Sequence, residues 1–287
     1  MARTVLPPLP VGEGWGEGDR TYSGNPGFIK LALLPVLILA AVFQPTATLA
    51  DSADPTTIGY SQGGRPLTVY HLGDGPQTVL ILGGQHGAPE VNTVRLAERL
   101  LAYFEDNPNE IPDRLRLDFI LQANPDGVAH GSRQFLSGVD PNRNWDSPDW
   151  MGDAFDSNGL FRFGLGGEEP FSEPETQELR DYVLDIRPVL VINYHSRGGF
   201  IFGGRARDLA EIYASASGYF VPRPSPGGGG GGPSLLGYRA TGSMNVWLSS
   251  EEIPAMLIEL ATSSDPEFAR NLAGLRAVLP VLVTPDS

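Results

Sequence analysis

Residues 189–193, with the sequence VLVIN, form a short and almost entirely apolar run. A run of this kind is typical of a central β-strand that is covered on both faces. Residues 255–260 (AMLIEL) and residues 78–82 (TVLIL) have the same character. We expect helices between such strands, and strands that alternate with helices indicate an α/β fold. The predicted fold class is a single-domain three-layer sandwich around a mixed, mostly parallel sheet.

Two helices and another strand can be placed around these runs. Apolar residues at helical spacing predict a helix over about 90–104. Ser172 begins the sequence Ser-Glu-Pro-Glu, which supplies a capping box and an early proline for a helix that ends near residue 186. Residues 66–72 are predicted to pair with residues 78–82 as neighbouring strands.

Residues 1–50 have a different character from the rest of the chain. Their apolar segment, residues 31–43, would span about 20 Å as a helix, which is less than the roughly 30 Å core of a bilayer. A secretory signal peptide with cleavage after Ala50 fits this segment. We expect residues 1–50 to be an N-terminal extension plus signal peptide. Residues 51–287 would then be a periplasmic or secreted domain, without a stable membrane anchor after cleavage.

Charge and composition exclude several kinds of partner and site. The net charge is −14, from 20 basic and 34 acidic residues, and such a surface repels the phosphates of nucleic acids. We therefore expect no nucleic-acid partner, and we expect a monomer. The chain contains no cysteine, which rules out disulfides, thiolate zinc sites and cysteine nucleophiles. Any metal ion must be bound by His, Asp or Glu.

Unusual polar residues follow the carboxyl ends of the predicted strands. His86 follows residues 78–82, His195 follows residues 189–193, and Glu259 lies near the end of AMLIEL. Open α/β sheets form their sites at this edge. Two neutral imidazoles and one carboxylate around an open coordination position make a catalytic zinc site. His86, Glu90 and His195 supply such a set and predict one Zn²⁺ per chain.

The order and spelling of these segments resemble the zinc carboxypeptidase family. That family has a histidine and a glutamate after a strand, an Asn-Pro-Asp-Gly turn, an arginine, a Gly-Val-Asp-x-Asn-Arg-Asn segment, a His-Ser pair and a late glutamate in an apolar strand. In this chain these segments read HGAPE (86–90), NPDG (124–127), Arg133, GVDPNRNW (138–145), YHS (194–196) and IEL (258–260). The resemblance covers roughly residues 65–280, and the short spacing after NPDG is closer to the bacterial murein-peptide amidase branch.

The resemblance implies a zinc-dependent metallocarboxypeptidase that hydrolyses a C-terminal peptide or amide bond, including bonds in cell-wall peptides. Zinc would be held by His86, Glu90 and His195. Glu259 would act as general base and then as proton donor to the leaving amine. Arg133 would donate a hydrogen bond to the oxyanion.

The resemblance also implies how the substrate is held. Asn142 and Arg143 would bind its free C-terminal carboxylate, Arg143 with a bidentate fork. Asp140 would hold the far nitrogen of His86 and so fix its tautomer. Tyr238 would cover the bound peptide, and Asn245 would lie in the pocket for the C-terminal side chain. A neutral residue there argues against a strict preference for charged side chains.

The chain departs from the family at its first motif, because three residues instead of two separate His86 from Glu90. On a helix both spacings leave the two side chains on one face, and Pro89 is tolerated in a first helical turn. The longer spacing also motivates another reading, a metal-poor peptide-binding protein on the same fold. A zinc deacylase of small N-acyl amino acids is a third reading.

Overall fold

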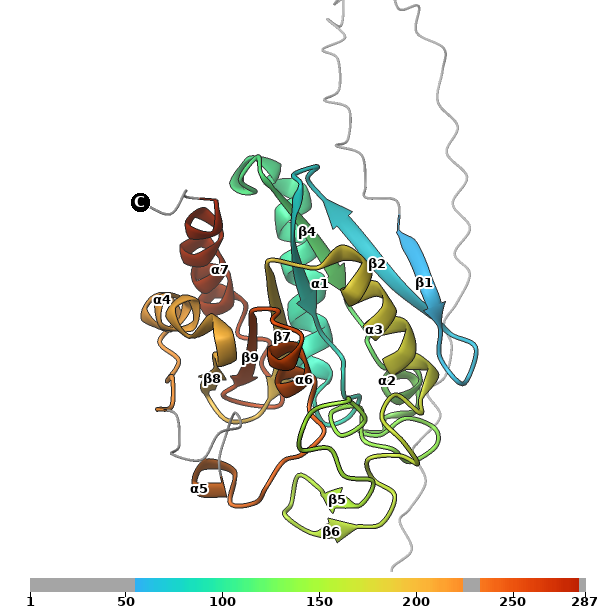
Figure 1. The fold of residues 1–287 in the computed structure, drawn as a ribbon. Helices are drawn as coiled ribbons and strands as arrows, with labels where there is room; N and C mark the ends of the chain where they lie inside the picture. The colour runs from blue at the N-terminus through green and yellow to red at the C-terminus, as the bar shows by residue number, and fades with distance from the viewer. Residues whose placement is uncertain (1–54, 224–232, 284–287) are drawn as a thin grey trace, which may run out of the picture. The chain divides into compact units, whose positions relative to one another are not determined.

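The computed structural model describes residues 55–223 and 233–283, so the signal-peptide prediction for residues 1–50 lies outside the described residues. Within them, seven strands form one sheet in the order β1-β2-β4-β3-β7-β9-β8 (Figure 1). These strands are β1 (Thr56–Tyr60), β2 (Pro66–Leu72), β3 (Gln77–Leu82), β4 (Leu115–Ile120), β7 (Leu190–Ser196), β8 (Phe200–Phe202) and β9 (Ala255–Leu260). A separate hairpin consists of β5 (Ala154–Phe155) and β6 (Phe161–Arg162).

Helices cover both faces of this sheet. They are α1 (Val91–Asp106), α2 (Pro125–His130), α3 (Pro174–Ile186), α4 (Arg207–Ser217), α5 (Pro233–Leu236), α6 (Met244–Ser250) and α7 (Phe268–Leu282). Two short 3₁₀ turns, Pro108–Glu110 and Gly204–Ala206, complete the described elements.

The centre of the sheet is parallel and its edges are antiparallel. Strands β4, β3, β7 and β9 run parallel to one another, whereas β1, β2 and β8 are antiparallel to their neighbours. This arrangement confirms the predicted fold class, an α/β sandwich around a mixed sheet. The predicted pairing of β2 with β3 is wrong, because β4 lies between them. Five of the six residues of β3 are buried, as a central strand requires, whereas burial in β2 is interrupted, as is typical nearer an edge.

Alternate residues of the central strands enter two different cores. Ile192 and Ile258 pack on one face against α1, α4 and α7. Val191 and Ala255 pack on the other face against α3 and α6. This alternation follows from the two-residue period of a strand and produces the three layers.

The same alternation positions two of the predicted site residues. Tyr194 and Ile258 belong to the first core, so their neighbours His195 and Glu259 point to the opposite face of the sheet. The parallel register of β7 and β9 pairs His195 directly with Glu259. The two side chains therefore lie side by side, although 64 positions separate them in the numbering of the chain.

The predicted helix over 90–104 is confirmed as α1, which begins one residue later and ends two residues later. The helix predicted from Ser172 is α3, but its capping by Ser172 is wrong. Pro174 occupies the first turn, so Glu173 is the N-cap residue, and it makes no side-chain cap. The Ser172 hydroxyl instead donates to the Glu173 carboxylate at 3.0 Å. A proline at the first helical position thus moves the helix start past the serine.

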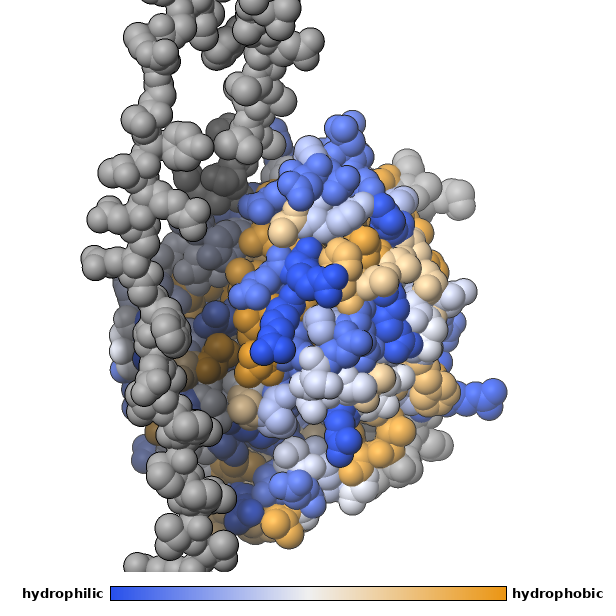
Figure 2. Space-filling model, turned by 180° about the vertical axis from the view of Figure 1, so that it is seen from behind, coloured by the Kyte–Doolittle hydropathy of each residue, from blue (hydrophilic) through white to orange (hydrophobic). Residues whose placement is uncertain are grey.

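Hydrophilic and hydrophobic residues are interspersed on the face seen from behind (Figure 2), as the 19% of charged residues leads one to expect. Among the described residues, no helix has the length and hydropathy needed to cross a membrane.

Candidate metal centre and catalytic cavity

The turn between β3 and α1 carries the first two candidate ligands. Glu90 is the residue before α1, and its backbone N–H donates to Gly87 O at 2.7 Å. The prediction that His86 and Glu90 share one helical face is therefore wrong, and Pro89 precedes the first helical turn. The additional residue is instead accommodated in the turn before α1. The turn brings residue 87 close to the backbone of Gly127, and only glycine fits there, because a Cβ at that position would lie 2.2 Å from the carbonyl oxygen of Gly127.

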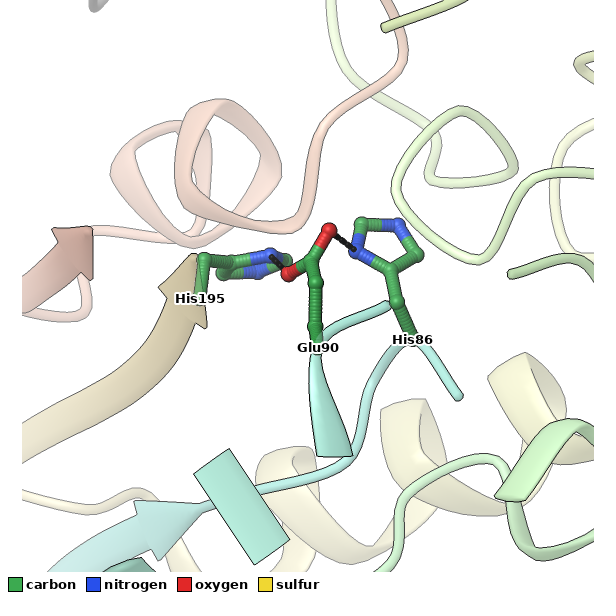
Figure 3. A group of neighbouring side chains, drawn as sticks. All are labelled: His86, Glu90 and His195. Atoms are coloured by element: carbon green, nitrogen blue, oxygen red, sulfur yellow. Dashed lines mark hydrogen bonds and ion pairs between the residues drawn. The ribbon is translucent and has the colours of Figure 1, made fainter. Parts of the chain in front are cut away.

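The three candidate ligands converge despite the lengthened spacing. His86 Nδ1 lies 3.0 Å from Glu90 Oε1, and His195 Nδ1 lies 3.2 Å from Glu90 Oε2. One ligand atom from each residue lies within 4.8 Å of the others, and all three residues are buried. Figure 3 shows the Glu90 carboxylate between the two imidazoles. The longer spacing between His86 and Glu90 therefore does not prevent metal binding, and it no longer favours the alternative of a metal-poor binding protein.

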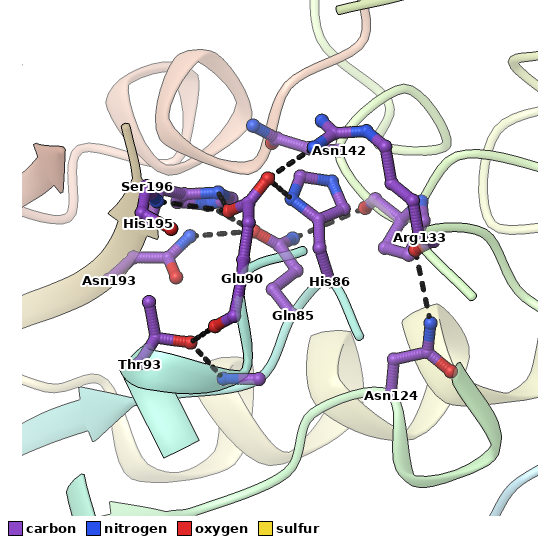
Figure 4. Close-up of polar contacts among 12 residues, drawn as sticks. Gln85, His86, Glu90, Thr93, Asn124, Arg133, Asn142, Asn193, His195 and Ser196 are labelled. Atoms are coloured by element: carbon purple, nitrogen blue, oxygen red, sulfur yellow. Dashed lines mark hydrogen bonds and ion pairs between the residues drawn. The ribbon is translucent and has the colours of Figure 1, made fainter. Parts of the chain in front are cut away.

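Neighbouring side chains turn the same nitrogen of each imidazole toward Glu90 (Figure 4). His86 Nε2 donates to Asp140 Oδ1 at 3.0 Å, and His195 Nε2 donates to Gln85 Oε1 at 2.8 Å. A neutral imidazole has one N–H, so these bonds leave the lone pair on Nδ1. Burial also lowers the pKa of His195, which favours the neutral ring.

These donors fit a zinc ion. Two Nδ1 atoms and one carboxylate match the ligand set of catalytic zinc sites, and partners on the far nitrogens are the usual means of orienting such histidines. His86 Nδ1 is buried and has no aligned hydrogen-bond partner among the described residues, although Glu90 is near. A cation at this point would satisfy that nitrogen. Gln85 was not foreseen, since a glutamine before a histidine carries no recognisable signal in one sequence.

Arg133 contributes positive charge directly beside the ligands. Its guanidinium donates to Glu90 Oε1, and its Nε donates to Asp140 Oδ2 at 3.0 Å. Burial alone would raise the pKa of Glu90, but the positive charge of the neighbouring Arg133 guanidinium favours the ionised form, and that pKa lies well below its usual range. Glu90 is therefore an ionised carboxylate, as a zinc ligand must be.

The NPDG segment positions Arg133. Asn124 caps α2 by accepting from Gly127 N at 2.8 Å, and Pro125 occupies its first turn. The Asn124 amide then donates to the backbone oxygen of Gln134 at 3.2 Å. What the sequence suggested as a turn is thus the start of a short helix that anchors the chain beside Arg133.

Glu259 lies beside His195 and lines the same cavity as the three ligands. Burial raises its pKa to about 8, and the neighbouring Glu90 carboxylate contributes to the shift. A carboxyl group with a pKa near neutral pH is suited to accept and return a proton.

The cavity has a volume of about 890 Å³ and brings the remaining predicted residues together. Asn142, Arg143, Tyr238 and Asn245 all line it. Asn142 Oδ1 accepts from Met244 N at 3.0 Å, and Arg143 donates to the backbone oxygens of Asn142 at 2.8 Å and of Phe155 at 3.1 Å. The Arg143 guanidinium lies 5.9 Å from the centre of the Tyr238 ring.

Asn245 adds an unpaired polar atom to this wall. Its Oδ1 is buried and has no hydrogen-bond partner within the described ranges 55–223 and 233–283. A buried acceptor without a donor is costly, which favours a hydrogen bond from a bound molecule.

Comparison with known families agrees with this geometry. Residues 45–210, more than half of the chain, match the family described as zinc carboxypeptidase. The chain belongs to the zinc carboxypeptidase family. The matched residues include His86, Glu90 and His195, whereas Tyr238, Asn245 and Glu259 lie beyond them and are brought to the site by the fold.

Individual relatives carry one recurrent name. Murein peptide amidase A of Escherichia coli strain K12 is 28% identical over 198 residues, which cover 66% of this chain and 73% of that protein. Murein peptide amidase A of Vibrio campbellii is 24% identical over 273 residues, 91% of this chain and 97% of that protein. The solved murein-tripeptide amidase of Escherichia coli O157 shares the fold, with a TM-score of 0.63 at 24% identity over 84% of this chain and 98% of that chain.

Membership in a zinc-dependent family and a buried His-Glu-His set together make the chain a zinc metallopeptidase or amidase. The predicted family, enzyme class and metal-dependent hydrolysis are confirmed at this level. The individual roles assigned to Glu259, Arg133, Asn142, Arg143, Tyr238 and Asn245 stay predictions.

Proposed function

We propose that this zinc carboxypeptidase family member hydrolyses the last peptide or amide bond of cell-wall peptides that end in a free carboxylate. The murein peptide amidases among its relatives support the substrate class. We also propose that it works in the periplasm or as a secreted protein. The apolar segment at residues 31–43, which has the length of a signal-peptide core, supports this location.

The main support for this function is the position of the candidate ligands beside Glu259. The ligand set His86, Glu90 and His195 converges from two distant segments of the chain and shares a single cavity with Glu259. Zinc held by that set would supply Lewis-acid chemistry, polarising the scissile carbonyl and activating water.

The other side chains of the cavity have complementary tasks. Glu259 takes a proton from the attacking water and returns it to the leaving amine, for which a pKa near neutral pH is favourable. Arg133 keeps the Glu90 and Asp140 carboxylates in place, and its partly exposed guanidinium offers positive charge where the carbonyl oxygen becomes an anion. Asn142 and Arg143 bind the C-terminal carboxylate of the substrate.

Amidation of the substrate's C-terminus should lower kcat/KM by about 100-fold, because it removes the charge-assisted hydrogen bonds to Arg143 and leaves a buried guanidinium without its anion. The measurement compares one peptide as free acid and as amide. In the Arg143→Met variant the two forms should react at similar rates. Equal rates in the wild-type enzyme would exclude Arg143 as the carboxylate clamp.

A substrate panel with and without chelator tests the proposed function itself. The panel contains murein tripeptide, unmodified dipeptides and small N-acyl amino acids. Chelator-sensitive release of the C-terminal residue from murein tripeptide is the expected result. Activity confined to N-acyl amino acids would instead identify a deacylase. Because Asn245 is neutral, we expect no strict preference for a charged C-terminal side chain.

A further inference from the structure

The three arginines that line the cavity differ in their contacts. Arg133 is held by Glu90 and Asp140, and Arg143 donates to two backbone oxygens. Arg197 also lines the cavity, but its side chain is exposed and makes no hydrogen bond, ion pair or ring contact with any described residue. Its charge is therefore available to a bound molecule.

The backbone on both sides of Arg197 is fixed to the catalytic centre. The N–H of Ser196 donates to Glu90 Oε2 at 3.0 Å, and the N–H of Gly198 donates to Leu260 O at 2.8 Å. Arg197 is thus placed between a candidate metal ligand and the strand that carries Glu259. Because the backbone of both flanking residues is hydrogen-bonded, the Cα atom of Arg197 has a fixed position on the cavity wall. Only the side chain that carries the guanidinium is flexible.

The position of Arg197 indicates which part of a substrate it meets. Figure 4 shows Ser196 and His195 on one side of Glu90, with Asn142 and Arg133 on the other side. If Asn142 and Arg143 bind the C-terminal carboxylate, the part of the substrate that precedes the scissile bond extends toward the side of Ser196 and Arg197.

The charge of the cavity and of the whole chain determines how an acidic group on the substrate would be received near Arg197. Glu90 contributes an ionised carboxylate to the cavity, and the whole chain carries a net charge of −14. An acidic group on the substrate would be repelled by these charges. A free guanidinium at the same place reverses that effect, because Arg pairs well with carboxylates through two parallel N–H donors.

We propose that Arg197 binds a carboxylate on the part of the substrate that precedes the scissile bond, so that the enzyme prefers peptides with an acidic residue there. This inference rests on the proposed function, since it assumes that the cavity binds a peptide in the stated direction.

The test uses matched peptides that have Glu or Gln, or Asp or Asn, immediately before the scissile bond. Their affinities are measured by calorimetry on the zinc-loaded full chain with the Glu259→Gln substitution, so that turnover does not deplete the ligand. The acidic peptide should bind about tenfold tighter than its amide, a typical value for a charge-assisted hydrogen bond. The preference should decrease as salt is added, because the guanidinium is exposed.

Three variants on that background separate a local effect from a general one. Arg197→Gln should abolish the preference, and Arg197→Lys should keep part of it, since the charge remains but the fork is lost. Arg95→Gln removes the same charge from an exposed position of α1 outside the cavity and should keep the full preference. Equal affinities on the Glu259→Gln background, or a preference that survives in Arg197→Gln, would overturn the proposal, as would a lack of binding by both peptides.

A kinetic comparison distinguishes this proposal from the proposed function. In the wild-type enzyme the acidic peptide should have the lower KM, with a smaller difference in kcat. If the zinc-loaded enzyme hydrolyses neither peptide while the affinities still depend on Arg197, the substrate assignment fails and Arg197 remains an anion-binding residue. If both peptides are hydrolysed with equal KM, the role of Arg197 fails and the proposed function stands.

Discussion

The Glu259→Gln substitution is expected to lower kcat by about 10²- to 10⁴-fold, the usual contribution of a general acid or base, without loss of bound zinc. Glutamine has the same shape but cannot accept a proton from water at neutral pH. Glu259 is not one of the three candidate ligands, so the metal site should persist. Steady-state kinetics together with zinc analysis of the purified variant measures both quantities.

Glu98→Gln is a suitable control, because Glu98 is exposed on α1 and does not line the cavity. It should have wild-type kinetics. If Glu259→Gln retained full activity, another group would have to move the proton. If the variant lost its zinc, Glu259 would belong to the metal site instead.

Removal of zinc by a chelator should lower hydrolysis by at least about 10³-fold, because a Lewis acid at the reacting carbonyl is worth several kcal/mol. Added Zn²⁺ should restore the activity. The midpoint of thermal unfolding should also rise with zinc, since an ion that binds only the folded chain stabilises it. Activity assays and calorimetry on the same samples measure these effects.

Two histidine variants identify where this zinc is bound. His195→Ala should lose both the metal and the activity, whereas His130→Ala should keep both, because His130 is exposed at the end of α2 and outside the candidate ligand set. Equal zinc contents in the two variants would contradict the assignment of His195.

The central strands could be predicted from the sequence because they are buried on both faces and therefore apolar throughout. The runs at residues 78–82, 189–193 and 255–260 correspond to β3, β7 and β9. Strand β8 and helix α4 were not foreseen. β8 is three residues long, which is too short to show a period, and its pairing depends on a partner, β9, far along the chain.

Convergence of the site could be anticipated, because parallel strands bring their carboxyl ends to one edge. The path of the backbone between His86 and Glu90 could not be predicted from the sequence. Two helical spacings were compared, but the structure has a turn there whose shape depends on the close approach of Gly87 to Gly127. The bond from Gln85 to His195 joins residues 110 positions apart and has no trace in local sequence.

In the proposed metal centre, one zinc ion is bound by two imidazole Nδ1 atoms and one carboxylate. A crystal structure of the zinc-loaded chain, with diffraction data collected on both sides of the zinc absorption edge, would locate that ion. We expect one anomalous peak about 2.0–2.2 Å from His86 Nδ1, His195 Nδ1 and a Glu90 oxygen. A peak away from these three atoms, or no peak in crystals soaked with excess zinc, would contradict it.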